Sequence, residues 1–228
     1  MEFGGLQKLT LLDFPGRVAC TLFTNGCNLR CPFCHNATLV LRPGTDEISE
    51  EEVFAFLEKR RGTLDGVAVT GGEPLLHPWM PEFLRRVRAM GYAVKLDTNG
   101  CFPDRLRGVL EEGLADMVAM DVKNSPERYG ITVGRENFDL NPVMASVDLL
   151  RNSGVCYEFR TTVVKGLHRP EDLAAIGRWL GPVPRYFLQN FKDSGDLLTQ
   201  GFEAFSEPEL DALLAAVRPY VPAAAIRG

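Results

Sequence analysis

The sequence has no long apolar run and no excess of positive charge. No stretch approaches the roughly 18 consecutive apolar residues that span a bilayer. The first five residues carry an acid where a secretory signal is basic. Lysine and arginine total 25 and aspartate and glutamate 30, so the net charge is −5. A nucleic-acid binder would present a basic field to phosphates. We therefore expect a cytoplasmic protein that binds neither membranes nor nucleic acid.

Histidine and cysteine are also scarce, with three and six residues respectively. Neither His77 nor His168 stands in a pattern typical of acid–base catalysis, so we assign them no catalytic role. The chain is large and shows no secretion signal, so its thiols are expected to be reduced rather than paired in disulfides. Cys20, Cys101 and Cys156 lie within or beside apolar segments and are expected to be buried thiols.

Apolar segments of strand character alternate with segments of helical period. The expected strands are residues 18–24, 66–70, 93–96, 117–120, 156–164 and 185–189. The expected helices are residues 49–60, 79–90, 104–112, 142–152, 171–180 and 207–217. Alternating strands and helices predict a parallel sheet with right-handed crossovers. Six such units are too few for a closed eight-stranded barrel. We therefore predict an α/β fold, a partial (βα)6 parallel barrel.

No low-complexity linker divides the chain, so we predict a single domain over residues 1–228. Its barrel core is expected at about 14–190, followed by a C-terminal tail, 191–228, that carries the last helix. Two helix starts are marked in the sequence: Ser49 as an N-cap with Glu52 three residues later, and Pro170 before two acids.

In parallel α/β folds, functional side chains collect at the carboxyl ends of the strands. The polar and cysteine-bearing segments of this chain fall at these positions, with Arg160 inside the fifth strand. They are residues 27–34, 71–74, 97–100, Asp121 with Lys123, and 189–191. The order of these segments predicts one site at this end of the sheet.

Cys27, Cys31 and Cys34 form a Cys-x3-Cys-x2-Cys motif. A cubane cluster has four irons, so three thiolates leave one iron open to a small molecule. A structural zinc site would need a fourth ligand, and His35 directly follows Cys34, which is poor spacing for a tetrahedral site. An electron-transfer ferredoxin would need a fourth cysteine. The motif favours the open 4Fe–4S cluster over both alternatives.

With Gly71-Gly72-Glu73-Pro74 following it, this motif resembles the radical S-adenosylmethionine (radical SAM) superfamily. Within the superfamily, the sequence resembles the activating enzymes of glycyl radical enzymes. It is most similar to the activating protein of anaerobic ribonucleoside-triphosphate reductase and less so to the pyruvate formate-lyase activating enzyme. The resemblance runs from about Leu6 to Asn190. The residues that carry it are 12–17, 34–36, 96–100 and 120–123.

The resemblance implies two cofactors, one 4Fe–4S cluster and S-adenosylmethionine. In that family the amino and carboxylate groups of S-adenosylmethionine chelate the open iron. An electron from the cluster, supplied by flavodoxin or ferredoxin, cleaves the sulfonium to methionine and a 5′-deoxyadenosyl radical. The radical removes a hydrogen atom from a glycine Cα of the partner, a glycyl radical enzyme. The protein supplies position and electrostatics for this chemistry.

The resemblance also assigns cofactor-binding residues. Gly71 and Gly72 lack side chains, so their backbone can approach the ammonium of the ligand closely. Glu73 can place a carboxylate near the same ammonium. Phe33 and Phe191 are candidates for contact with the adenine, although an ordinary packed phenylalanine is equally compatible with the sequence.

Three oxygen-bearing side chains, Asp97, Thr98 and Asp121, are expected to bind a monovalent cation by the same resemblance, because hard cations prefer oxygen ligands. Two acids at neighbouring strand ends repel each other unless a cation lies between them. The alternative is that these acids only cap turns. Lys123 and Arg160 are expected to point toward the ligand carboxylate, and an arginine in an apolar strand needs an anionic partner if it is buried.

Three functions are compatible with the sequence. The first is activation of an anaerobic ribonucleotide reductase, or alternatively of a pyruvate formate-lyase-like enzyme. The second is radical chemistry on a small molecule, such as a nucleoside-modifying carbon–carbon bond former. The third is a non-enzymatic metal-binding or electron-carrying protein. Residues 37–70 contain no cysteine, which argues against activases with a ferredoxin-like insertion. The loop 13–16 is expected to line the partner-facing opening.

Overall fold

The computed structural model describes residues 1–41, 44 and 47–227, and every predicted site residue lies within these ranges. An eight-stranded sheet has the order β10-β9-β8-β7-β6-β5-β3-β2. All neighbouring strands are parallel except β2, which is antiparallel to β3. The strands are β2 (Gly5–Thr10), β3 (Ala19–Thr24), β5 (Gly66–Gly71), β6 (Ala93–Thr98), β7 (Met117–Asp121), β8 (Cys156–Val163), β9 (Tyr186–Asn190) and β10 (Ala224–Arg227). The predicted α/β fold with a mostly parallel sheet is confirmed.

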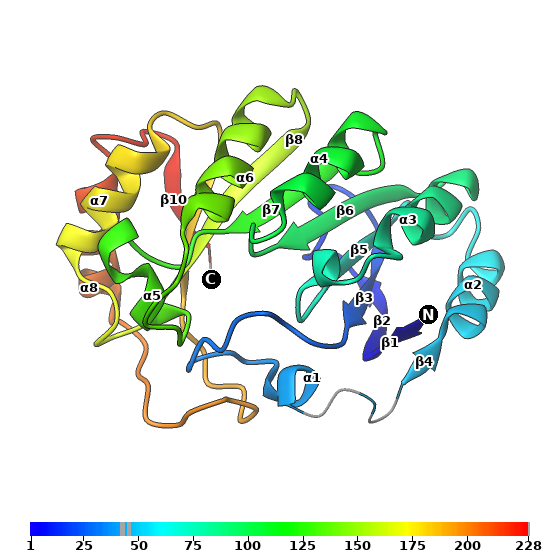
Figure 1. The fold of residues 1–228 in the computed structure, drawn as a ribbon, viewed down its shortest axis with the longest axis horizontal. Helices are drawn as coiled ribbons and strands as arrows, with labels where there is room; N and C mark the ends of the chain where they lie inside the picture. The colour runs from blue at the N-terminus through cyan, green and yellow to red at the C-terminus, as the bar shows by residue number, and fades with distance from the viewer. Residues whose placement is uncertain (42–43, 45–46, 228) are drawn as a thin grey trace.

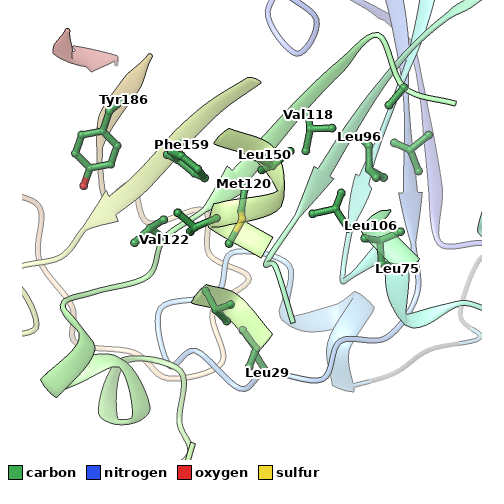
Figure 2. Packing of buried hydrophobic residues seen from close by; sticks show 14 of the residues in the cluster. Leu29, Leu75, Leu96, Leu106, Val118, Met120, Val122, Leu150, Phe159 and Tyr186 are labelled. Atoms are coloured by element: carbon green, nitrogen blue, oxygen red, sulfur yellow. The ribbon is translucent and has the colours of Figure 1, made fainter. Parts of the chain in front are cut away.

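Helices pack along the outer face of this curved sheet, where α3, α4 and α6 lie side by side (Figure 1). The helices are α1 (Ala37–Leu41), α2 (Glu50–Lys59), α3 (Met80–Ala89), α4 (Pro103–Glu111), α5 (Tyr129–Thr132), α6 (Asn141–Asn152), α7 (Pro170–Leu180) and α8 (Glu207–Val217). Side chains alternate along each strand, and those facing the helices form one large apolar core. Figure 2 shows Leu96 and Val118 of the strands packing with Leu106 and Leu150 of the helices.

Both helix starts marked in the sequence are confirmed. At α2, the Ser49 hydroxyl accepts a hydrogen bond from the Glu52 amide at 3.2 Å, and the Glu52 carboxylate accepts one from the Ser49 amide at 2.9 Å. At α7, which begins at Pro170, the Asp172 carboxylate accepts a hydrogen bond from the amide of the preceding residue, Arg169, at 3.0 Å. These bonds satisfy amides that a helix leaves unpaired at its first turn.

Two strands of the main sheet lie outside the expected core 14–190. β2 precedes this core and pairs with β3. β10 belongs to the segment expected as a tail, and it pairs with β9 as the last strand of the sheet. β2 is a half-exposed edge strand containing Gln7 and Lys8, and β10 has only four residues, so neither shows a strong strand pattern. A second, two-stranded sheet pairs β1 (Glu2–Phe3) with β4 (Ile48–Ser49). The assignment of 1–228 to one domain stays a prediction.

The N-terminal ends of the parallel strands are closed by Phe14. Its ring is 3% exposed and packs with Ala19 and Met117, the first residues of β3 and β7. The expectation that the loop 13–16 lines the opening at the carboxyl ends is therefore wrong for Phe14, which lies at the opposite end of the sheet. Ala19, Gly66 and Ala93, the first residues of β3, β5 and β6, are small and leave space for this ring.

None of the described helices combines the length and the hydropathy that a membrane span requires.

We predict that Phe14→Ala lowers the free energy of unfolding by about 3 kcal/mol, because the ring is buried and alanine leaves a void at the end of the barrel. Urea denaturation measures this change. Leu12→Ala is the matched control, since that side chain is 87% exposed and its loss should matter by less than about 0.5 kcal/mol. Equal effects of the two substitutions would contradict the packing described for Phe14.

Candidate active site

A cavity of about 310 Å³ lies between the inner face of the sheet and the cysteine loop, residues 26–36. Most of the residues predicted from the sequence line it. They are Cys27, Cys31, Phe33, Cys34, Gly71, Gly72, Glu73, Asp97, Thr98, Asp121, Lys123 and Arg160. Phe191 is not brought into the wall: it is buried against Phe202, with ring centroids 6.4 Å apart.

The cysteine loop is held by segments distant in sequence. The Arg30 guanidinium donates a hydrogen bond to the Cys27 carbonyl at 2.7 Å, and the Arg30 amide donates to the Val133 carbonyl at 3.0 Å. On another side, the Thr199 amide donates to the Pro32 carbonyl at 2.8 Å. These bonds pair backbone groups that a loop would otherwise leave unsatisfied, so the loop has a defined shape.

The three thiols lie in a buried, partly polar setting. The Cys27 sulfur accepts a hydrogen bond from the Leu29 amide at 3.4 Å and lies 3.7 Å from the Asn99 side-chain amide. Burial raises the pKa of Cys27, and it raises the pKa of Cys31 to about 12 despite the opposing charge of Lys123. In the described part of the chain, no three His, Cys, Asp or Glu side chains converge tightly enough to hold a single metal ion. Three thiols spread around one cavity suit a multi-iron cluster better than a zinc ion.

Gly71 and Gly72 are required by the neighbouring backbone. A Cβ at Gly72 would lie 1.8 Å from the carbonyl oxygen of Gly26. Gly71 has a φ of +111°, and a Cβ there would lie 2.4 Å from the amide nitrogen of Thr24. Asn36 donates a side-chain hydrogen bond to the Gly71 carbonyl at 3.1 Å. The turn after β5 therefore lies directly against the residues that lead into the cysteine loop. This close approach alone requires glycine at both positions, whether or not they also contact a ligand.

Glu73 connects the turn after β5 with the end of β6. Its carboxylate accepts hydrogen bonds from the Leu75 amide at 3.0 Å, the Thr98 hydroxyl at 2.8 Å and the Asn99 amide at 2.7 Å. The side chain is 1% exposed, and this burial raises its pKa to about 7 against the effect of the three hydrogen bonds. A cationic ligand at the cavity wall would favour the ionised form.

Arg160 of β8 lies between the two strand-end acids. Its guanidinium donates to the Asp97 carboxylate at 3.1 Å and to the Asp121 carboxylate at 3.0 Å. Lys95 also pairs with Asp97, and Lys123 pairs with Asp121 at 2.9 Å. Burial alone would raise the pKa of Asp121, but Arg160 and Lys123 outweigh it and hold that pKa below its usual range.

These pairs bear on the monovalent cation expected at Asp97, Thr98 and Asp121. The positive charge between the two acids is the guanidinium of Arg160, and the Thr98 hydroxyl is directed to Glu73. The cation site therefore stays a prediction that this side-chain arrangement does not favour. Two partly buried acids that already share the charge of an arginine need no metal ion between them.

His35 is part of the cavity wall, whereas His77, His168, Cys20, Cys101 and Cys156 lie outside it. His168 is 2% exposed; its ring accepts a hydrogen bond from the Val164 amide and lies 2.8 Å from the Lys123 carbonyl. It therefore connects the backbone of these two segments and has a structural role. Cys20 is fully buried, as expected, and Cys101 is partly buried. The expectation for Cys156 is wrong: it is exposed, because it is the first residue of β8.

Several residues of the wall were not assigned from the sequence. Asn99 donates a hydrogen bond to the Asn28 side chain at 2.8 Å beside Cys27, and Asp13 accepts one from the Thr21 hydroxyl at 2.6 Å. Asn99 and Asn36 both directly follow motif residues, which was the available signal. Asp13 belongs to the loop 13–16 that the sequence placed at the opening, and it lines the cavity. Gln7 had no signal, since the strand β2 that brings the N-terminal segment to the cavity was not predicted.

A family model described as the radical SAM superfamily matches residues 21–180 of this chain. The chain belongs to the radical SAM superfamily. It is 30% identical over 229 residues to a candidate glycyl-radical enzyme activating enzyme of Methanocaldococcus jannaschii, covering 98% of this chain and 94% of that protein. It is 27% identical over 168 residues to the pyruvate formate-lyase-activating enzyme of Clostridium pasteurianum, covering 71% and 68% of the two chains.

A third relative of this radical SAM enzyme is the 7-carboxy-7-deazaguanine synthase of Methanopyrus kandleri, 32% identical over 64% of this chain and 66% of that protein. Among solved structures, a domain of the pyruvate-formate lyase-activating enzyme from Bacteroides vulgatus has a TM-score of 0.58 at 19% identity, covering 72% of this chain and 99% of that one. Streptococcus suis SuiB bound to S-adenosylmethionine has a TM-score of 0.69 at 14% identity, covering 89% and 48%. These structures support the fold.

Membership of the radical SAM superfamily means that the chain is an enzyme that uses a 4Fe–4S cluster and S-adenosylmethionine. The donor set fits, because the cavity wall contains three thiols on one loop and both cationic and anionic side chains opposite them. When bound, the cluster supplies the electron that cleaves the sulfonium of S-adenosylmethionine. The chain itself holds the ligands, excludes water and fixes the charges around them.

We predict that Gly72→Ala loses most of the iron that reconstitution gives the wild type, because the new methyl group displaces the Gly26 backbone directly before Cys27. Iron and sulfide per chain measure this. Gly108→Ala is the matched control: nothing lies within 4 Å of its hypothetical Cβ in helix α4, so it should keep the cluster and gain about 0.5–1 kcal/mol of stability. Full iron content in Gly72→Ala would contradict the close approach.

A second prediction concerns pH. Without ligands, the folded-state pKa of Glu73 is about 7, above its usual 4.5, so the folded form binds a proton more tightly than the unfolded form. The stability it contributes is complete below pH 4.5 and falls as the pH rises toward 7. Glu73→Gln should remove this pH dependence of the free energy of unfolding, which amounts to about 3 kcal/mol between pH 4.5 and pH 7. Chemical denaturation of cluster-free protein at several pH values tests it, and parallel slopes for both proteins would contradict it.

Proposed function

We propose that this radical SAM enzyme activates a glycyl radical enzyme by removing a hydrogen atom from a glycine Cα of that protein. The observation that carries the proposal is the similarity to the candidate activating enzyme of M. jannaschii, which extends over 98% of this chain and 94% of that one. Similarity over nearly the full length includes the cysteine motif and the segments that build the cavity opposite it.

The size of the cavity supports a protein substrate. At about 310 Å³ it lies at the small end of ligand pockets, which range over roughly 300–1,000 Å³. A cluster and S-adenosylmethionine leave little of that space for a separate metabolite. A backbone glycine carried on a loop of a partner protein needs the least additional room.

Among glycyl radical enzymes, we propose an anaerobic ribonucleoside-triphosphate reductase as the substrate. The sequence Leu12-Asp13-Phe14-Pro15-Gly16-Arg17 and the compact chain, with no cysteine in residues 37–70, support this choice. The similarity to pyruvate formate-lyase-activating enzymes supports a pyruvate formate-lyase-like partner as the alternative. We propose flavodoxin or ferredoxin as the electron donor.

The proposed roles of the cavity residues rest on the family resemblance, and their places in the cavity wall support them. Cys27, Cys31 and Cys34 hold the cluster. Lys123 and Arg160 stand at the wall beside carboxylates and offer donors to the carboxylate of S-adenosylmethionine. The turn with Gly71, Gly72 and Glu73 faces its amino group, and Phe33 faces its adenine. Phe191 contributes to this pocket only through the Phe202 ring that also packs against Phe33.

A second candidate function is radical chemistry on a small molecule. The similarity to a 7-carboxy-7-deazaguanine synthase over 64% of this chain favours it. Such an enzyme would cleave S-adenosylmethionine faster in the presence of its metabolite and would leave no radical on a protein.

We predict that the anaerobically reconstituted and reduced enzyme releases 5′-deoxyadenosine from S-adenosylmethionine, and that it generates a glycyl radical in the anaerobic ribonucleotide reductase of the same organism. Chromatography detects the nucleoside, and electron paramagnetic resonance detects the radical. Cys31→Ala should abolish both signals, because it removes a proposed cluster ligand. Cys20→Ala is the matched control, since that thiol is buried away from the cavity.

The outcomes separate the candidate functions. A radical in pyruvate formate-lyase and none in the reductase would transfer the proposal to the alternative partner. Cleavage stimulated by a deazapurine precursor, with no protein radical in either partner, would replace it with the small-molecule function.

A further inference from the structure

A buried carboxylate on β8 is neutralised by the last strand of the sheet. Glu158 is 0% exposed, and its two oxygens accept hydrogen bonds from the two terminal nitrogens of Arg227 at 2.7 and 2.9 Å. The Arg227 guanidinium also lies 3.5 Å from the centroid of the Phe187 ring on β9. Two parallel hydrogen bonds and a stacked ring fix the plane of the guanidinium, which a lysine could not reproduce.

Glu158 is a close neighbour of the arginine at the cavity wall. Glu158 and Arg160 are separated by one residue of the same strand, so both side chains point to the inner face. Burial alone would lower the pKa of Arg160, but Asp121, Asp97 and then Glu158 outweigh it, and the pKa lies above its usual range. Glu158, Asp97 and Asp121 therefore all act on the charge of the same guanidinium.

We propose that Arg227 is a positioning residue for the cofactor site. By occupying both oxygens of Glu158, it leaves Arg160 paired with Asp97 and Asp121 at the cavity wall, where a ligand carboxylate can reach it. This inference rests on the role proposed above for Arg160 toward S-adenosylmethionine, and it is independent of which substrate the enzyme acts on.

The energetic argument concerns what Glu158 does without its partner. An ionised carboxylate buried without a counter-charge is strongly destabilised, so it takes the nearest cation available. Arg160 is the cation on the same strand and the same face, two residues from Glu158. Movement of Arg160 toward Glu158 draws its donors along β8, away from the carboxyl end where the cavity lies.

The test is a double-mutant comparison on the reconstituted enzyme, with the Kd for S-adenosylmethionine measured by equilibrium dialysis. Arg227→Gln should weaken binding about five- to tenfold. Glu158→Gln/Arg227→Gln should restore the Kd to within about twofold of the wild type, because the competing carboxylate is gone. Iron content and thermal midpoint are recorded for each variant, so that cluster loss is not read as weakened binding.

Two outcomes overturn the inference. An unchanged Kd in folded, cluster-loaded Arg227→Gln would show that Glu158 does not compete for Arg160. A double variant as weak as Arg227→Gln would show that Arg227 acts through packing on Phe187 rather than through charge. If Arg227→Gln does not fold, Arg227→Met, which removes the charge and keeps an apolar side chain, is compared with Arg227→Met/Glu158→Gln, and equal Kd values in that pair overturn the inference.

The measurement separates this inference from the proposed function. Binding of S-adenosylmethionine is measured without any partner protein, so a normal Kd in Arg227→Gln leaves the activation of a glycyl radical enzyme standing. Absence of a glycyl radical in every partner, with the expected order of Kd values, removes the proposed function and leaves the positioning role of Arg227 intact.

Discussion

The pairing of Arg160 with Asp97 and Asp121 organises the inner face of the sheet. Each of the three residues comes from a different strand, so the ion pairs also fix the relative positions of β6, β7 and β8 at the cavity. These side chains are only partly exposed, and a charge with little access to water needs a partner. Lys95 and Lys123 complete the pairing on either side. The site is therefore an arrangement of matched charges, and changing one of them affects its neighbours.

The cysteine loop depends on a different constraint, the need to satisfy the backbone of a long irregular segment. Its Arg30 amide donates a hydrogen bond to the Val133 carbonyl on one side, and its Pro32 carbonyl accepts one from the Thr199 amide on another. Asp196 accepts hydrogen bonds from the amide of Thr38 at 3.1 and 3.2 Å, near the start of the short helix that follows the loop. These contacts explain how a loop presents three thiols to one cavity without regular secondary structure.

Much of this architecture could be predicted from the sequence. The alternation of strand and helix patterns gave the six central strands, because buried strands and amphipathic helices have distinct periods. The cavity residues could be predicted because parallel strands place their carboxyl ends together. The edge strands β2 and β10 could not, since one is half exposed and the other very short. The partners of Arg160 also required the structure, because strand register decides which acids it reaches. Phe14 was expected at the wrong end of the sheet, because a phenylalanine packs equally well in several apolar settings. The adenine contact of Phe191 stays a prediction.

The contacts of Asp196 have a consequence for how the enzyme is made. Asp196 and Thr38 are separated by 158 positions in the chain. During synthesis the three cysteines leave the ribosome long before Asp196 and Thr199 exist. The loop can take its final shape only after most of the sheet has assembled and the segment following β9 has emerged.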